Sequence, residues 1–360
     1  MTNDLVYDQR MQRICTSVAN AGYDVLLIGR KLKNSKQLKD EAYQQKRIFC
    51  FFNAGKLFYL EYNLRLFFSL LFTMADCYCA IDLDTILPNY FVSSIKGKKR
   101  VYDAHELFTE QKEIVTRPGI KKIWMAIERF AVPKFPDGYT VNDFIVKELK
   151  IRYGVHYDIV RNLPKLNRII PIANSCDPFI IYQGAVNEGR SFETLIPAMK
   201  LVNARLVICG NGNFFEQVKQ LIKTLHLEDK VELKGMVPPD ELKKITPKAS
   251  VAVMLFENNG LNQYQSLANR FFDYIMAGVP QVCVNYPQYK TINDEYHIAE
   301  LIEDNAVETI AKALNNLLKD TVKHNEIREN CLSARERLNW ENEEMTLIDF
   351  YKNLFTSQSF

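Results

Sequence analysis

The chain has 360 residues, of which 47% are hydrophobic and 25% charged, and its net charge at pH 7 is +3. This composition excludes an intrinsically disordered chain. The length exceeds what one hydrophobic core usually serves, so two globular domains are expected.

Positive charge is concentrated in the first half of the chain. Residues 1–170 contain 27 Lys and Arg against 18 Asp and Glu, a net charge of +9, whereas the remaining residues carry −6. This asymmetry favours an anionic membrane or a lipid-linked acceptor as the partner of the first half, with an ordinary solvated surface as the alternative. Four cations lie on one short segment: Lys96, Lys98, Lys99 and Arg100.

The eight cysteines include no CxxC pair and no histidine at metal-ligand spacing. Most stand in apolar runs, as Cys209 does at the end of residues 206–209. They predict buried, reduced thiols in a cytosolic protein, and no metal site is expected. The polar start of the chain has no features of a signal peptide.

Strands and helices are expected to alternate along the first half. A helix over residues 7–21 precedes a buried strand over residues 24–29. Further strands are predicted over residues 47–52, 77–81, 99–102, 138–141 and 158–160. The most hydrophobic run, residues 64–80, contains Arg65 and Asp76 and is short for a membrane span. It predicts a buried helix, with a membrane contact as the alternative.

Residues 162–178 contain Pro164, Pro171 and Pro178 without a clear period, which predicts a connector between domains. Alternation then resumes. Strands are predicted over residues 179–183, 205–209, 231–234, 250–254, 281–284 and 299–302. Helices are predicted over residues 192–202, 214–224, 268–277, 306–318 and 322–338, and after Trp340.

This alternation predicts an α/β protein with two doubly wound parallel sheets. Ligands of such sheets bind beyond the carboxyl ends of the strands. The cleft between two facing sheets is therefore the expected site.

The first polar cluster of the second half, residues 182–191, follows a predicted strand and leads into a helix. It contains Gly184 and Arg190. A helix N-terminus and an arginine both favour phosphate, so the cluster predicts an anion site, with a plain turn as the alternative.

The second cluster, residues 207–213, contains Gly210 and Gly212, which allow a backbone to approach a ligand closely. Phe215 stands where a dinucleotide-binding motif has its third glycine, which argues against a nicotinamide enzyme.

The third cluster, residues 259–280, is the most specific. Asp273 lies in a helix among apolar residues, where a carboxylate needs partners. Two vicinal ribose hydroxyls would supply them. The alternatives are a solvated carboxylate or a pair with Arg270, three residues earlier.

These motifs resemble those of family-4-type retaining glycosyltransferases of the GT-B fold. The family's donor helix commonly reads Ser-Leu-Pro-Asn-Lys-Phe-Phe-Glu-Tyr-x-x-x-Gly-x-Pro. Residues 266–280 read Ser-Leu-Ala-Asn-Arg-Phe-Phe-Asp-Tyr-Ile-Met-Ala-Gly-Val-Pro. The resemblance extends to the Gly184 and Gly210 clusters and to residues 233–238.

The resemblance implies two facing Rossmann-like domains, both doubly wound, and a C-terminal crossover helix. The first, acceptor-side domain would span residues 1–165 and be completed by residues 340–360, and the nucleotide-sugar-binding domain would span residues 166–339. The family opens with a strand before the helix that here begins near Tyr7, so the first strand is expected to be missing.

The resemblance also assigns a donor site. Asp273 takes the place of a ribose-binding glutamate, and Arg190 that of a diphosphate-binding lysine. Amides around Ser266 and Leu267 would approach the phosphates. The predicted donor-binding residues are Gly184, Gly210, Gly212, Met236, Gln265, Ser266, Leu267, Asn269 and Asp273.

In the first half, His105 resembles the family histidine that reaches the transferred sugar, and with Arg190 it is predicted to be catalytic. The alternative for His105 is a packed loop histidine. Asn162 resembles the asparagine at the family's domain junction. Two positions depart from the family pattern: Gln265 replaces the first glutamate of a Glu-x7-Glu pair, and Ala185 replaces a second basic residue.

The implied reaction moves a sugar from a nucleoside diphosphate sugar to a glycan or lipid-linked acceptor, with retention, in surface polysaccharide or glycolipid synthesis. No cofactor, metal ion or nucleic acid is expected, and the protein would be cytoplasmic and peripheral to the inner face of the membrane. One alternative is a catalytically impaired protein that binds sugar nucleotides, favoured by Gln265 and the missing strand. Another is a sugar-nucleotide epimerase or phosphorylase, although no cofactor lysine for a phosphorylase is found.

Overall fold

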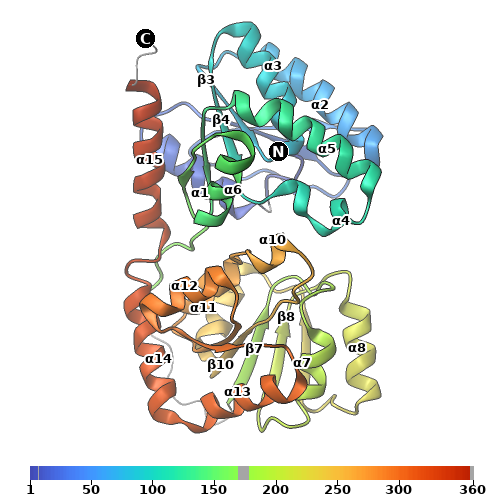
Figure 1. The fold of residues 1–360 in the computed structure, drawn as a ribbon, viewed down its shortest axis with the longest axis vertical. Coiled ribbons are helices and arrows are strands. Elements are labelled where there is room, and N and C mark those ends of the chain that lie inside the picture. Colours follow the sequence, from blue (N-terminus) through green and yellow to red (C-terminus); the bar gives the residue numbers. More distant parts are fainter. Residues whose placement is uncertain (7, 169–177, 357–360) are drawn as a thin grey trace. The chain divides into compact units, whose positions relative to one another are not determined.

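The computed structural model describes residues 1–6, 8–168 and 178–356. The chain divides into two compact units, the first made of residues 1–162 and 341–360 and the second of residues 163–340 (Figure 1). These bounds lie a few residues from those expected. The expected connector lies partly outside the described residues, as do Tyr7, Pro171 and Cys176.

The first unit contains two pieces of parallel sheet. β1 (Leu26–Lys31) pairs with β2 (Gln44–Phe49). The other piece contains, in this order, β3 (Cys77–Ile81), β4 (Lys99–Ala104), β5 (Asp137–Thr140) and β6 (Asp158–Ile159). The helices are α1 (Gln9–Asn20), α2 (Gly55–Leu71), α3 (Ile86–Lys96), α4 (Lys112–Val115), α5 (Pro118–Ala131) and α6 (Asp143–Tyr153).

The start of the described chain lies against β1 without forming a strand. The amino group of Met1 donates to the carbonyl of Ile28 at 2.8 Å, and the amide of Arg30 donates to the carbonyl of Asn3 at 3.0 Å. In the described residues no strand precedes α1.

The last helix, α15 (Trp340–Thr356), packs on the first unit. The ring of Phe350 meets that of Tyr139 in β5, with ring centroids 5.3 Å apart. Glu343 accepts a hydrogen bond from the backbone amide of Arg161 at 2.5 Å. The expected crossover helix is therefore confirmed.

The second unit is built on one parallel sheet of six strands, in the order β12-β11-β10-β7-β8-β9. The strands are β7 (Phe179–Gln183), β8 (Arg205–Cys209), β9 (Val231–Gly235), β10 (Val251–Met254), β11 (Gln281–Val284) and β12 (Ala299–Ile302). The helices are α7 (Phe192–Ala198), α8 (Phe215–Thr224), α9 (Pro239–Ile245), α10 (Leu261–Tyr264), α11 (Asn269–Met276), α12 (Pro287–Tyr296), α13 (Val307–Lys319) and α14 (Thr321–Ala334).

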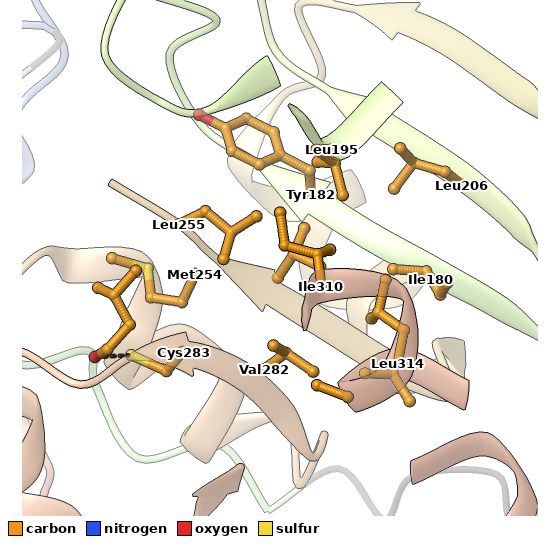
Figure 2. Packing of buried hydrophobic residues seen from close by; sticks show 14 of the residues in the cluster. Ile180, Tyr182, Leu195, Leu206, Met254, Leu255, Val282, Cys283, Ile310 and Leu314 are labelled. Atoms are coloured by element: carbon orange, nitrogen blue, oxygen red, sulfur yellow. Dashed lines mark hydrogen bonds between the residues drawn. The ribbon is translucent and has the colours of Figure 1, made fainter. Parts of the chain in front are cut away.

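Both faces of this sheet are covered. Ile180 and Tyr182 of β7 join the larger apolar cluster, whereas Ile181, between them, joins the cluster on the other face. Figure 2 shows Ile310 and Leu314 of α13 lying against the sheet side chains of the larger cluster. Because the residues of β7, β8, β10 and β11 meet covered faces on both sides, these central strands read as almost continuous apolar runs.

Two expectations for the first unit are wrong. β2 begins at Gln44, three residues before the predicted start, because its polar residues Gln44, Gln45 and Lys46 pair with β1, its one partner among the described residues. The apolar run over residues 64–80 spans the end of α2 and all of β3, and Leu64 and Phe68 are exposed. This run is therefore not a single buried helix.

The cysteines of the described chain are free, as expected. Five of them are buried: Cys15, Cys50, Cys209, Cys283 and Cys331. Burial raises the pKa of the Cys209 thiol to about 11. No helix in the described residues combines the length and apolar character that crossing a membrane requires.

Candidate functional site

The carboxyl ends of β7 and β8 lead into two glycine loops that pack against each other. The amide of Gly184 donates to the carbonyl of Cys209 at 2.9 Å, and the amide of Val186 donates to the carbonyl of Asn211 at 3.1 Å. Because the two strands are parallel neighbours, their loops emerge side by side at this edge of the sheet.

Gly210 and Gly212 are required by this packing. A Cβ atom on Gly210, whose φ is +159°, would lie 1.8 Å from the carbonyl oxygen of Gly184. A Cβ atom on Gly212 would lie 2.3 Å from the carbonyl oxygen of Val186. The sequence attributed these glycines to close approach of a ligand, but the close approach in the structure is between the two loops. Their contact with a donor stays a prediction.

Two guanidinium groups lie against the ring of Phe256, which follows β10. The Cζ atom of Arg190 lies 4.0 Å from the centroid of the Phe256 ring, and that of Arg270 lies 4.8 Å from the same centroid. Burial and the charge of Arg270 lower the pKa of Arg190 to about 10. Cation–π contact with the ring stabilises each cation but does not neutralise it.

Arg270 is held in place from three directions. Its Nη1 donates to the hydroxyl of Tyr182 at 2.7 Å, its Nη2 to the carbonyl of Leu255 at 3.4 Å, and its Nε to the sulfur of Met254 at 3.1 Å. The Tyr182 hydroxyl in turn donates to the carbonyl of Ala185 at 2.6 Å. The arginine on α11 is thereby tied to the first glycine loop.

Neither guanidinium has an acidic partner among the residues that the structure describes. Two cations side by side in a largely dry setting repel each other, and desolvation adds to that cost. An anion placed between them would relieve both effects. This arrangement supports the sequence prediction of an anion site at Arg190, and it adds Arg270, which the sequence considered only as a partner of Asp273.

Asp273, half-buried on α11, is oriented by a chain of polar contacts. Its Oδ2 accepts a hydrogen bond from Nε2 of Gln183 at 3.1 Å. The Oε1 of Gln183 accepts from the hydroxyl of Thr246 at 2.6 Å. Because an ionised carboxylate only accepts hydrogen bonds, the Gln183 amide must direct its Nε2 to Asp273, which leaves Oε1 to accept from the Thr246 hydroxyl. Asp273 therefore lies at the end of β7, beside the first glycine loop.

The segment before α11 is fixed by Tyr289 from α12. The hydroxyl of this buried tyrosine accepts from the amide of Ala268 at 3.1 Å and lies 3.4 Å from the hydroxyl of Ser266. Gln265 accepts a hydrogen bond from the side chain of Gln288 at 3.3 Å. Ser266 and Leu267 thus lie just before α11, which begins at Asn269, and the contact of these residues with the phosphates stays a prediction.

Met236, the other predicted donor-binding residue, directly follows β9 and is exposed. β9 is the edge strand next to β8, so Met236 lies at the carboxyl edge of the same sheet. Its role in binding a donor stays a prediction.

In the first unit, His105 follows β4 and pairs with Asp82, which follows β3. The Nε2 of His105 lies 3.0 Å from Oδ2 of Asp82. Burial, and then the carboxylates of Glu106 and Asp84, raise the pKa of Asp82 well above its ordinary value. A carboxyl group therefore orients the histidine, and its contact with a transferred sugar stays a prediction.

Ligand atoms of Asp82, His105 and Glu106 lie within 4.8 Å of one another, a spacing that a metal ion would accept. The sequence predicts no metal in this protein. Asn162, at the boundary of the first unit, accepts a hydrogen bond from Arg13 of α1.

Residues 167–333 match the family model of glycosyl transferases group 1. This segment of the chain is therefore similar to group 1 glycosyltransferases. The match covers most of the second unit, including the glycine loops, both arginines and Asp273.

A curated relative is a poly(glycerol-phosphate) alpha-glucosyltransferase of Bacillus subtilis (strain 168), 27% identical over 158 residues. The aligned segment covers 41% of this chain and only 22% of that protein's length.

Solved glycosyltransferases share the fold over nearly the whole chain. A sucrose-phosphate synthase from Thermosynechococcus elongatus superposes with a TM-score of 0.79 at 15% identity, covering 97% of this chain and 93% of its own. HepE of Anabaena, solved with UDP and glucose, has a TM-score of 0.72 at 12% identity, and the superposition covers 99% of this chain and 98% of HepE. WaaG, a glycosyltransferase of lipopolysaccharide biosynthesis, has a TM-score of 0.70 at 14% identity, and the superposition covers 97% of this chain and 96% of WaaG. The chain therefore has the GT-B fold, as the resemblance implied.

The packing of the glycine loops yields a prediction on stability. Gly210→Ala should lower the free energy of unfolding by about 1–3 kcal/mol, the usual cost of overpacking, because the new methyl group overlaps the Gly184 carbonyl. Urea denaturation measures this change. Gly119→Ala, in α5 where a Cβ atom meets nothing within 4 Å, is the control and should be neutral or stabilising. Equal unfolding midpoints for the two variants would contradict the loop packing.

Proposed function

We propose that this protein transfers a sugar from a nucleoside diphosphate sugar, with a uridine or guanosine base, to an acceptor, with retention of configuration. The observation that carries the proposal is the pair Arg190 and Arg270 around Phe256, without an acidic partner in the described chain. It lies at the carboxyl edge of a group 1 glycosyltransferase domain, where parallel sheets bind ligands.

In this proposal each part of the site has a task. The two guanidinium groups stabilise the negative charge that develops on the leaving diphosphate, and they are already fixed before the reaction begins. Amides at the start of α11 add partial positive charge. Asp273 accepts hydrogen bonds from the two ribose hydroxyls. A donor phosphate oxygen takes the acceptor's proton, so no protein base is needed, and His105 contacts the transferred sugar.

The chemistry of named relatives supports this donor class. HepE has been solved with UDP and glucose, and the Bacillus subtilis relative is named as an alpha-glucosyltransferase. We extend this to a glycan or lipid-linked acceptor in surface polysaccharide or glycolipid synthesis. We also place the protein in the cytoplasm, at the inner face of a membrane.

A donor-binding protein without transferase activity is the second candidate, and Gln265 favours it. This residue is a neutral amide where the resemblance expects a carboxylate, and its Oε1 accepts from Gln288. One assay distinguishes the two candidate functions. The protein is incubated with UDP-glucose and other nucleotide sugars, and free nucleoside diphosphate is then measured. Donor binding without any release of diphosphate, with or without acceptor, would favour the second candidate.

Arg190→Ala should reduce turnover by about 10²–10³-fold, the usual loss when one stabilising group is removed from a developing negative charge. Steady-state release of diphosphate measures the change, and thermal unfolding checks the fold. Arg205→Ala is the matched control, because Arg205 begins β8 at the opposite end of the same sheet. A rate for Arg190→Ala equal to that of the control would remove Arg190 from the site.

Asp273→Ala should weaken donor binding by about 1.5–3 kcal/mol for each charge-assisted hydrogen bond lost to a ribose hydroxyl. Isothermal titration calorimetry with UDP measures the affinity. The control is Asp240→Ala, an exposed aspartate of α9 paired with Lys243. The ribose assignment fails if Asp273→Ala binds UDP as tightly as the wild type.

We propose that transfer requires no metal ion, because Arg190 and Arg270 already supply positive charge for the diphosphate. Asp82, His105 and Glu106 belong to the other unit, so a metal ion bound by them would coordinate His105 and neither of the two arginines. Activity should therefore survive dialysis against EDTA without loss. A loss that Mg²⁺ or Mn²⁺ restores would contradict this prediction and assign the metal to that group.

A further inference from the structure

α2 exposes one apolar face to solvent while it buries another. Its buried stripe consists of Phe58, Tyr62, Leu66 and Leu70, spaced by four residues. The opposite face carries exposed leucines and a phenylalanine at spacings of three or four: Leu57, Leu60, Leu64 and Phe68. Such spacing places them on one side of a helix. A helix on the surface of a soluble domain ordinarily presents polar residues on that side.

Further apolar side chains extend this face. After the helix, Phe72 and Met74 are 83% and 96% exposed. α3 packs beside α2 (Figure 1). It exposes Phe91 and Ile95.

The segment after β2 adds Phe51 and Phe52, also exposed, whose backbone amides donate to the carboxylate of Glu61 on α2. We call the exposed side chains of α2 together with Phe51, Phe52, Phe72 and Met74 the outer α2 face.

Basic side chains border this face at the C-terminal end of α2. The Nζ of Lys96 donates to the carbonyls of Leu70 and Thr73, at 3.3 and 2.6 Å. Lys98 pairs with Asp76 at 2.7 Å, two residues beyond Met74. The cationic segment that the sequence singled out is therefore fixed next to the most exposed apolar residues of the unit.

We propose that the outer α2 face and its basic border dock on an anionic lipid bilayer. Apolar side chains that lie flat on a surface, bordered by lysine and arginine, suit the boundary between acyl chains and anionic headgroups. Contiguous exposed apolar surface of this kind marks an interaction site. The charge decides for lipid over a second copy, because an isologous dimer would bring two sets of the same cations into one interface.

The purpose of this docking rests on the proposed function, since it would bring the acceptor-side unit to a lipid-linked acceptor. The binding itself does not depend on that function. The apolar face and the basic border are both needed, because either feature alone gives only marginal, reversible attachment to a membrane.

The test is flotation of the full chain with vesicles of phosphatidylcholine, with and without phosphatidylglycerol. The wild type should float with the anionic vesicles, less at high salt, and only weakly with the neutral ones. The double variant Leu64→Ser/Phe68→Ser should reduce binding by about tenfold or more, as should Lys98→Gln/Arg100→Gln. The control Leu201→Ser/Val322→Ser changes two exposed apolar residues of the second unit and should float as the wild type does.

Three outcomes would overturn the proposal. The first is no flotation of the wild type with anionic vesicles at low salt. The second is equal binding of the Leu64→Ser/Phe68→Ser variant and the control. The third is a lipid-free dimer in light scattering that this variant dissolves, which would make the face a contact between copies.

Calorimetry with UDP on the same variants separates this proposal from the proposed function. The outer α2 face belongs to the first unit, so its variants should bind UDP as the wild type does. Vesicle binding without UDP binding in the wild type would refute the donor and leave the docking in place. UDP binding without vesicle binding would refute the membrane docking and leave the proposed donor site in place.

Discussion

The second unit depends on the pairing of β7 with β8 on one side and β10 on the other. Both faces of β7 are covered, so a ligand can reach the strand only at its carboxyl end. Three consecutive residues there have separate tasks: Tyr182 positions Arg270, Gln183 orients Asp273, and Gly184 contacts the neighbouring loop. One strand end thus sets the positions of both charged side chains of α11, Arg270 and Asp273, relative to the glycine loops.

The same burial explains why most of the second unit could be predicted from its sequence. A parallel strand covered on both faces must be apolar throughout, and such runs are easy to find between glycine-bearing turns. The loop after β7 that carries Gly184 and Arg190, and the helix that carries Asp273, were also predictable, whereas the contacts of these residues with a donor stay predictions. Phe256 and the role of Arg270 were not predictable, because their contacts join segments far apart in the chain and no local pattern reports them.

The first unit was predicted less well, for a related reason. Hydrophobic patterns assume that apolar residues are buried, and α2 and the end of β2 break that assumption. Leu64 and Phe68 look like core residues in the sequence, yet they are exposed. A sequence cannot tell an apolar face that covers a sheet from one that faces outward, because the chemistry of the side chains is the same. Only the position of the sheet decides between them.

The contact between the two glycine loops has a consequence for how this domain can change. The carbonyl of Val186 both crowds Gly212 and accepts a hydrogen bond from the amide of Phe214 at 3.0 Å. Asn187 likewise accepts from the amide of Asn213 at 3.1 Å. Neither loop can therefore be lengthened or reshaped while the other stays as it is. For protein engineering, residues 184–187 and 209–214 form a single unit, and a loop graft from a protein of the same fold must carry both segments.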